Sequence, residues 1–261
     1  MKERSENIRR KLLPAGTFLL IILIWWALSA GGVVPAYMLP SPVDVCKAFV
    51  RDFPNLMHHA LVSVKEAAYG LLIGAALAFV LACTMDRFLR LEEAVFPLLV
   101  VTQTIPTIAI APLLVLWMGF GMAPKIVLVI ITTFFPIAVS LLDGFKSVDT
   151  DAIALMRSMN ATRWQIFRHV KFPTALPSFF SGLRISASYA VVGAVISEWL
   201  GGFEGLGVYM TRVRKAYAFD KMFAVIILIT AISLLLMATV NLLRRLSMPW
   251  LRPDEEHFEK Y

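Results

Sequence analysis

Long apolar runs alternate with short polar segments along the sequence. Six runs are long enough to cross a membrane, since one helical span needs about 20 apolar residues. They cover roughly 14–30, 61–84, 91–118, 124–142, 175–200 and 222–243. None shows the strict alternation of apolar and polar residues that is typical of membrane barrels. The pattern predicts an all-α integral membrane protein with six transmembrane helices in one domain, residues 1–261.

The first and third runs differ from the others. The first resembles a signal peptide, but Leu28-Ser29-Ala30 is a poor cleavage site, so we expect a retained span. The third contains Pro97, Pro106 and Pro112, and internal prolines kink helices. It is therefore either a bent but packed span, or a kinked helix that lines a pathway. In the second case, the polar atoms at membrane depth come from Thr102, Gln103, Thr104 and Thr107.

Composition agrees with a membrane location. Hydrophobic residues make up 59% of the 261 residues and charged residues only 16%. A soluble domain could not bury so much apolar surface, so a water-soluble fold is excluded. Cys46 and Cys83 are too few for a disulfide framework. His58 and His59 have no third ligand at metal spacing, so we expect no metal site.

The net charge of +7 sets orientation. In a soluble protein it could indicate nucleic acid, but here the basic residues lie mostly between and beyond the apolar runs, and we expect no nucleic-acid partner. If the N-terminus is cytoplasmic, sixteen Lys and Arg residues lie inside, in 1–13, 85–93, 143–174 and 244–261, and six lie outside. This imbalance predicts two cytoplasmic termini. Lys65, Lys125 and Arg184 are near helix ends, where they could reach the interface.

The polar insertion 143–174 carries the most information. Asp149-Thr150-Asp151 supplies N-cap candidates for a short helix, and Asn160 tolerates the left-handed conformation that ends helices. Thr162 is an N-cap candidate for a second short helix, which Pro173 and Pro177 stop before the fifth span. Two interpretations of this insertion stay open: its helices project into the cytoplasm as a docking site for a partner, or they lie on lipid headgroups.

This insertion resembles the Glu-Ala-Ala loop of permease subunits in ATP-binding-cassette importers. Asn160 stands where that family has Gly, Ala154 stands where it has Glu, and the proline pair falls on Pro173 and Pro177. The branch that imports nitrate, sulfonates, taurine and pyrimidine precursors of thiamine is similar over nearly the whole chain. The similar segments are 161–170, Leu39-Pro40-Ser41-Pro42, Gly119-Phe120-Gly121 with Ala123-Pro124-Lys125, and Glu198-Trp199-Leu200 with Gly205-Leu206-Gly207.

The resemblance implies a type I ABC importer permease (MetI-like) fold in a bacterial inner membrane. Two copies of the chain would form the pore, and two ATPase subunits would bind the insertion 143–174 of each copy. An extracytoplasmic binding protein would deliver the solute. The residues expected to couple the loop to the ATPase are Asp151, Ala154, Arg157, Asn160, Ala161, Arg163 and Trp164. Asp151, one turn before Ala154, is the candidate to replace the missing acid. The chain has no G-x-x-x-x-G-K-[ST] segment, so ATP and Mg²⁺ would be bound by the partner and the chain would not be an enzyme.

In the fifth span, small residues recur every fourth position and end at an acid: Ser178, Gly182, Ser186, Ala190, Ala194 and Glu198. Such a row favours close helix packing, although it could also line a pore. Glu198 is either an interfacial acid paired with Arg212 or Arg214, or a gate or substrate-facing group. The resulting candidate pathway consists of Thr102, Gln103, Thr107, Ser186 and Glu198.

Two other functions would each require a feature of their own. A stand-alone secondary transporter would show inverted repeats and matching broken helices in two halves, and a membrane-embedded enzyme would need a catalytic cluster at the interface. Neither feature is visible in the sequence. The mostly apolar pathway does not favour a highly charged solute. We expect a thiamine pyrimidine precursor or another small aromatic or vitamin-like molecule, with nitrate, a sulfonate or taurine as the alternatives that the resemblance implies.

Overall fold

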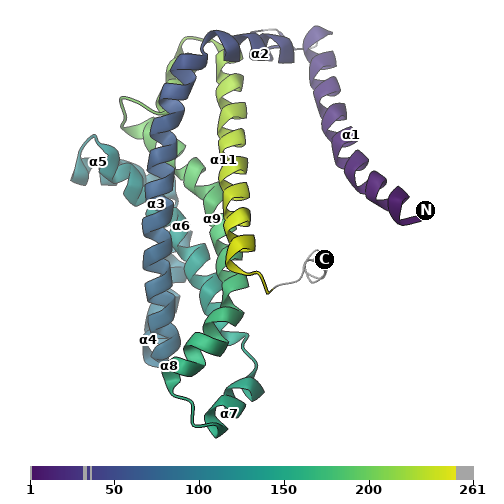
Figure 1. Ribbon diagram of the computed structural model, residues 1–261. Coiled ribbons are helices and arrows are strands. Elements are labelled where there is room, and N and C mark those ends of the chain that lie inside the picture. The colour runs from purple at the N-terminus through teal and green to yellow at the C-terminus, as the bar shows by residue number, and fades with distance from the viewer. Residues whose placement is uncertain (1, 32–33, 36, 251–261) are drawn as a thin grey trace. The chain divides into compact units, whose positions relative to one another are not determined.

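A computed structural model describes residues 2–31, 34–35 and 37–250, in which every regular element is helical (Figure 1). Arg252 and Lys260, which enter the charge count for sidedness, lie outside the described residues. The elements are α1 (Lys2–Ala30), α2 (Pro42–Arg51), α3 (Phe53–Arg87), α4 (Leu89–Thr104), α5 (Thr107–Met118), α6 (Met122–Lys146), α7 (Thr150–Ser158), α8 (Arg163–Ile166), the π-helix η1 (Phe167–Lys171), α9 (Phe172–Leu200), α10 (Leu206–Lys215) and α11 (Phe219–Ser247).

The predicted all-α membrane fold is confirmed. Among the described residues, four helices are long and apolar enough to span a membrane: α3, α6, α11 and the continuous segment Arg163–Leu200. The bent pair α4 and α5 makes a fifth span if both helices are counted together. The apolar part of α1, Gly16–Ala30, is shorter than these, so the count of six spans stays a prediction.

The third predicted span is bent, as its prolines indicate. Helices α4 and α5 meet at 97°, and the break lies at Ile105 and Pro106. Ile105 is extended (φ −81°, ψ 121°) because the residue before a proline disfavours the helical region. Pro97 and Pro112, by contrast, lie inside α4 and α5. Only the central proline therefore interrupts the helical span.

The chain divides into two compact units. One contains residues 1–59 and 209–228, and the other contains residues 60–208 and 229–261. We call them unit 1 and unit 2 and describe each by itself. A single domain over 1–261 stays a prediction.

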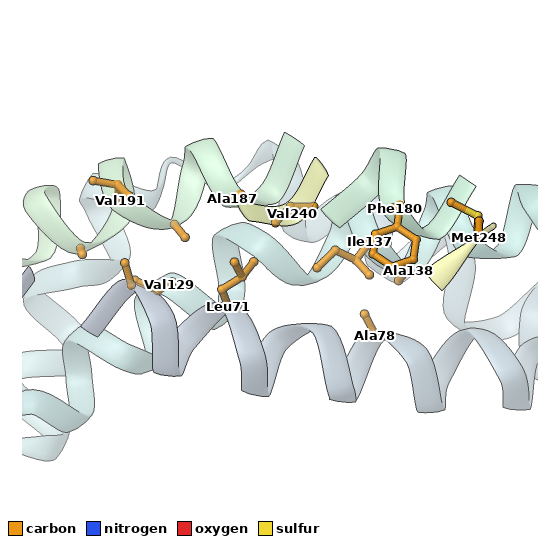
Figure 2. Packing of buried hydrophobic residues seen from close by; sticks show 13 residues of the cluster. Leu71, Ala78, Val129, Ile137, Ala138, Phe180, Ala187, Val191, Val240 and Met248 are labelled. Atoms are coloured by element: carbon orange, nitrogen blue, oxygen red, sulfur yellow. The ribbon is translucent and has the colours of Figure 1, made fainter. Parts of the chain in front are cut away.

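Unit 2 is built on the close packing of α6 against α9. Its apolar core joins side chains from α3, α6, α9 and the end of α11, among them Leu71, Ile137, Phe180, Val191 and Val240 (Figure 2). The row of small residues on α9 faces this core: Ser186, Ala190 and Ala194 are fully buried. The packing interpretation of that row is thus confirmed.

In unit 1, helix α2 and residues 209–215 of the short helix α10 lie in polar segments between the apolar runs. Ser41 caps α2 by accepting a hydrogen bond from the backbone N–H of Asp44, and Pro42 begins the helix. This Ser-Pro start is a common helix signal, since a proline at the first position needs no hydrogen bond there. Trp25 and Ser29 of α1 donate to the carbonyls of Pro40 and Leu39, at 3.1 and 3.0 Å.

Gly182 tests the α6–α9 packing. A Cβ at this position would lie 2.6 Å from the carbonyl oxygen of Pro136 and 2.8 Å from Cβ of Ser140. Gly182→Leu should therefore force α6 and α9 apart and abolish the folded species in size-exclusion chromatography, because lipid does not replace the lost contacts. The neighbouring Ser181 is exposed, so Ser181→Leu should leave the elution profile unchanged. Equal behaviour of the two variants would contradict this packing.

Candidate functional site

The loop between α6 and α9 begins with a capped helix. Asp149 is the N-cap of α7 and accepts a hydrogen bond from the backbone N–H of Asp151 at 2.8 Å. The helix closes where Asn160 adopts a left-handed conformation (φ 58°), with Ala161 N–H bonded to the carbonyl of Met156 at 3.0 Å. These are the start and end that the sequence indicates.

The second short helix is capped as predicted but does not stop where predicted. Thr162 and Gln165 form a capping box at the start of α8. The expected stop at Pro173 and Pro177 is wrong: α8, η1 and α9 form one helix over Arg163–Leu200, and Pro177 lies inside α9. A proline ring inside a regular α-helix clashes with the carbonyl four residues earlier. The wider π-helical turn just before Pro173 changes the hydrogen-bond register there, which explains why the helix continues.

The loop presents its side chains outward. Asp151, Ala154, Arg157, Asn160, Arg163 and Trp164 are exposed, and Ala161 is half-buried. Trp164 is 65% exposed, although its ring stacks on Phe167 with centroids 5.7 Å apart. Phe167 also contacts Phe145 of α6 at 5.6 Å and Phe172 of α9 at 6.1 Å. An unbroken aromatic path therefore joins an exposed loop residue to the membrane helices.

Ion pairs tie the loop to the neighbouring helix ends of unit 2. Lys171 of η1 lies 2.6 Å from Asp86 at the end of α3, and Lys146 at the end of α6 lies 2.5 Å from Glu92 of α4. Both pairs are partly exposed, so each contributes little to stability alone. They nevertheless fix where the loop leaves the helices.

The candidate pathway residues lie in two different environments. Thr102 and Gln103 are exposed and Thr107 is half-buried, on either side of the α4–α5 break. Thr102 donates its hydroxyl to the carbonyl of Leu99 at 2.6 Å. Ser186 and Glu198 are buried inside unit 2, where the Ser186 hydroxyl donates to the carbonyl of Thr133 at 2.8 Å. The structure thus gives Ser186 a helix-packing role.

Glu198 belongs to a buried polar cluster within unit 2. Its Oε1 accepts a hydrogen bond from the Ser63 hydroxyl at 2.6 Å, and its Oε2 accepts one from the backbone N–H of Gly207 at 2.5 Å. Ser63 in turn accepts from the backbone N–H of Leu206 at 2.8 Å. Glu198 is 1% exposed. The structure therefore gives the carboxylate partners other than the arginines considered in the sequence.

A buried ion pair completes this cluster. Lys125 of α6 lies 2.7 Å from Oε1 of Glu66 on α3, and it reaches the carbonyl of Glu204 at 3.4 Å. Both side chains are almost completely buried. Glu66 Oε2 has no hydrogen-bond partner among the described residues. The expectation that Lys125 reaches the membrane interface is wrong, because a buried carboxylate holds its ammonium group inside the protein.

The turn between α9 and α10 is shaped around this cluster. Gly205 has a positive φ of 122°, and a Cβ there would overlap the carboxylate of Glu198. Only a glycine supplies both this backbone conformation and this space. The polar cluster thereby fixes the loop that follows α9.

Sequence reasoning missed Glu66, although a signal was present. Glu66, Lys125 and Glu198 each lie near the end of a different apolar run, and the predicted topology puts those three ends on the same side of the membrane. Ser63 and Glu66 are three residues apart and so share a helix face. Opposite charges at matching membrane depth would have predicted this contact.

The ion pair can be tested by a double-mutant cycle. Lys125→Met should lower the free energy of unfolding by about 3–5 kcal/mol, because it leaves Glu66 charged, buried and unpaired. Adding Glu66→Met should recover part of that loss, since neither charge then remains. Chemical unfolding in detergent would measure both. If the losses of unfolding free energy in Lys125→Met and Glu66→Met alone sum to the loss in the double variant, Lys125 and Glu66 do not interact.

Residues 70–253 match the family described as binding-protein-dependent transport system inner membrane component. The chain is 36% identical to the formylaminopyrimidine transport permease protein ThiX of Halalkalibacterium halodurans, over 89% of this chain and 94% of that protein. It is 32% identical to the riboflavin transport system permease protein RibX of Chloroflexus aurantiacus, over 95% and 94%. The resemblance found in the sequence is thereby confirmed.

The fold has a counterpart among solved structures. The MetNI methionine ABC transporter in an inward-facing conformation aligns with a TM-score of 0.60 at 21% identity, over 77% of this chain and 96% of that one. At this identity the match shows the fold alone. The expected importer-permease fold is confirmed.

Proposed function

The chain belongs to the family of binding-protein-dependent transport system inner membrane components, and we propose that two copies of it form the translocation pathway of an ATP-binding-cassette importer. A separate ATPase subunit on each copy would drive transport, and an extracytoplasmic binding protein would deliver the solute. The exposed loop of α7 and α8 is the observation that carries this proposal. ATP and Mg²⁺ would bind to the ATPase partner, so this chain would not itself be an enzyme.

The loop suits a coupling role because it is rigidly continuous with a membrane helix. Arg163 and Trp164 begin a helix that runs without interruption to Leu200. A displacement imposed on the loop would therefore move α9 rather than be absorbed by a flexible connection. Exposed Trp and Arg side chains are also the residues that most often dominate binding energy at interfaces.

The two departures from the family loop have different consequences. Asn160 adopts the left-handed conformation that Gly would take, so the turn is retained. Ala154 supplies no carboxylate, but Asp151 is exposed on the same helix three residues earlier. Residues three apart share a helix face, so Asp151 would present an acid to the ATPase close to the usual position.

Two groups of residues would contribute differently to the pathway. Thr102, Gln103 and Thr107 surround the α4–α5 break, where hydroxyl and amide groups would face a passing solute. Ser186 and Glu198 would reach the pathway only if α9 moved relative to α3 and α6, because both are buried here. The relatives named for formylaminopyrimidine and riboflavin support a small, nitrogen-containing heteroaromatic solute.

Counting membrane crossings supports the sidedness. Three crossings, α3, the α4–α5 pair and α6, separate helix α2 from the loop of α7 and α8. An odd number of crossings puts α2 and this loop on opposite sides. With the loop and both termini in the cytoplasm of a bacterial inner membrane, α2 and α10 would be extracytoplasmic.

The coupling role can be tested at Arg163 and Trp164. Arg163→Glu with Trp164→Ala should leave the permease folded but lower binding-protein-stimulated ATP hydrolysis about tenfold or more, the loss expected when a Trp and an Arg that dominate an interface are removed. Reconstituted complexes would be assayed for ATP hydrolysis and uptake. Arg245→Glu, an exposed basic residue near the end of α11, is the matched control. Unchanged stimulation in the double variant would reject the coupling assignment.

Cysteine labelling tests the sidedness. Cys46 and Cys83 would first be replaced, and single cysteines then placed at Ser158 of α7 or Thr211 of α10. An impermeant maleimide should label the first only from the cytoplasmic side and the second only from outside, as the asymmetry of Lys and Arg predicts. Labelling of both positions from one side would contradict the proposed topology.

A further inference from the structure

The buried polar cluster of unit 2 contains more acids than bases. It holds two carboxyl groups, those of Glu66 and Glu198, and one ammonium group, that of Lys125. Each of the two acids is 1% exposed, and in the part of the chain that the structure describes they are the only buried acids. With all three groups ionised, one uncompensated negative charge would lie away from water, which is costly.

A single cation faces these two acids. Among the described residues, the hydrogen bonds and ion pairs of the Glu66 and Glu198 carboxyl groups include one positive charge, that of Lys125. The turn that follows α9 contributes backbone groups instead: the Gly207 N–H donates to Glu198, and the Glu204 carbonyl accepts from Lys125. The side chain of Glu204 is exposed. The excess of acid is therefore not balanced by a second base.

One oxygen of the cluster lacks a partner, and it lies beside the second acid. Glu66 Oε1 accepts from Lys125 at 2.7 Å, whereas Glu66 Oε2 is the only buried side-chain oxygen or nitrogen without a hydrogen-bond partner among the described residues. The carboxyl groups of Glu66 and Glu198 lie within hydrogen-bonding reach of each other. Two ionised carboxylates only accept hydrogen bonds, so they repel each other in such a contact. A proton on either group makes the same contact a donor–acceptor pair.

We propose that Glu66 and Glu198 bind one proton between them, in a hydrogen bond to Glu66 Oε2. This proton satisfies the unpartnered oxygen and leaves the cluster neutral, with one negative charge opposite the Lys125 ammonium group. It belongs to the pair rather than to either acid, because groups that interact this strongly titrate together. The site is a property of the chain alone and does not depend on the proposed transport function.

A buried water is the other way to satisfy Glu66 Oε2. Buried waters typically bridge about three polar groups that would otherwise be unsatisfied, but the described residues offer one such side-chain atom. A water would also leave both carboxylates ionised beside a single ammonium group. The shared proton accounts for the unpartnered oxygen and for the excess of acid together.

The shared proton would hold the turn after α9 in place. Glu198 accepts from the Gly207 N–H at 2.5 Å, and Ser63, which donates to Glu198, accepts from the Leu206 N–H at 2.8 Å. Gly205 packs so closely on Glu198 that a Cβ would overlap its carboxyl group. Loss of the proton would put two repelling carboxylates beside this turn, so its contact with α3 should weaken as the pH rises.

Infrared spectroscopy detects the proton directly. The full chain in nanodiscs at neutral pH should show the carbonyl stretch of a protonated carboxylic acid, and Glu66→Gln should lack this band. The new amide can donate to Glu198 while its oxygen still accepts from Lys125, so the variant should fold without the shared proton. Glu93→Gln removes an exposed acid of α4 and is the matched control, which should keep the band.

The pH dependence of unfolding gives a second measurement. Above about pH 6 the carboxyl groups of an unfolded chain are ionised, so the folded chain holds one proton that unfolding releases. Stability should therefore fall as the pH rises. Relative to Glu66→Gln, the unfolding equilibrium constant of the unmodified chain should rise about tenfold per pH unit while the pair keeps its proton. Chemical unfolding in detergent between about pH 6 and pH 8 would compare the two chains.

Four results would overturn the shared proton. The first is the absence of the acid band from the unmodified chain, which would assign Glu66 Oε2 to a water. The second is a band that persists in Glu66→Gln or disappears in Glu93→Gln. The third is an equal pH dependence of unfolding in the unmodified chain and Glu66→Gln. The fourth is a Glu66→Gln chain that does not fold, because the amide is expected to replace the proton.

Discussion

The close approach of α6 and α9 is the constraint on which unit 2 depends. Lipid gives membrane helices no hydrophobic reason to associate, so contact must come from packing and from hydrogen bonds. Gly182 lets the backbone of α9 approach the carbonyl of Pro136 on α6, and the Ser186 hydroxyl bonds to the carbonyl of Thr133 one turn further along. The two helices are also consecutive membrane spans, and the loop that joins them is the proposed ATPase contact.

The two ends of this helix pair have different chemistry. At one end, aromatic rings and partly exposed ion pairs connect the loop to α3, α4 and α6. At the other end, Glu66 of α3 and Lys125 of α6 form a buried ion pair, and the Glu198 carboxylate of α9 accepts hydrogen bonds from Ser63 and from the backbone N–H of Gly207. Separating Glu66 from Lys125 would leave an uncompensated charge buried away from water. We therefore expect the ends of α3, α6 and α9 at the cluster to move as one body, while the ends at the loop adjust more easily.

Hydrophobic runs and capping residues predict the fold well, because both are local signals. The spans, the bend near Pro106, the cap at Thr162 and the left-handed Asn160 all follow from neighbouring residues. Two features were missed because they depend on contacts between distant segments or on unusual helix geometry. The Glu66–Lys125 pair joins residues 59 positions apart, and a π-helical turn carries the chain past Pro173. For the same reason, the sequence could place Glu198 near a span end but could not identify Ser63 and Gly207 as its partners.

Backbone strain separates two helix ends that otherwise look alike. Among the described residues, Asn160 and Tyr217 are the non-glycine residues with positive φ, and both follow the end of a short helix. Asparagine adopts the left-handed conformation more readily than other non-glycine residues, so Asn160 ends α7 at small cost. Tyrosine has no such preference, and the Tyr217 ring, which is 78% exposed, contacts Phe219 with centroids 6.3 Å apart. The turn after α10 therefore holds more strain than the turn after α7, and the elements on either side of Tyr217 must hold it in that conformation.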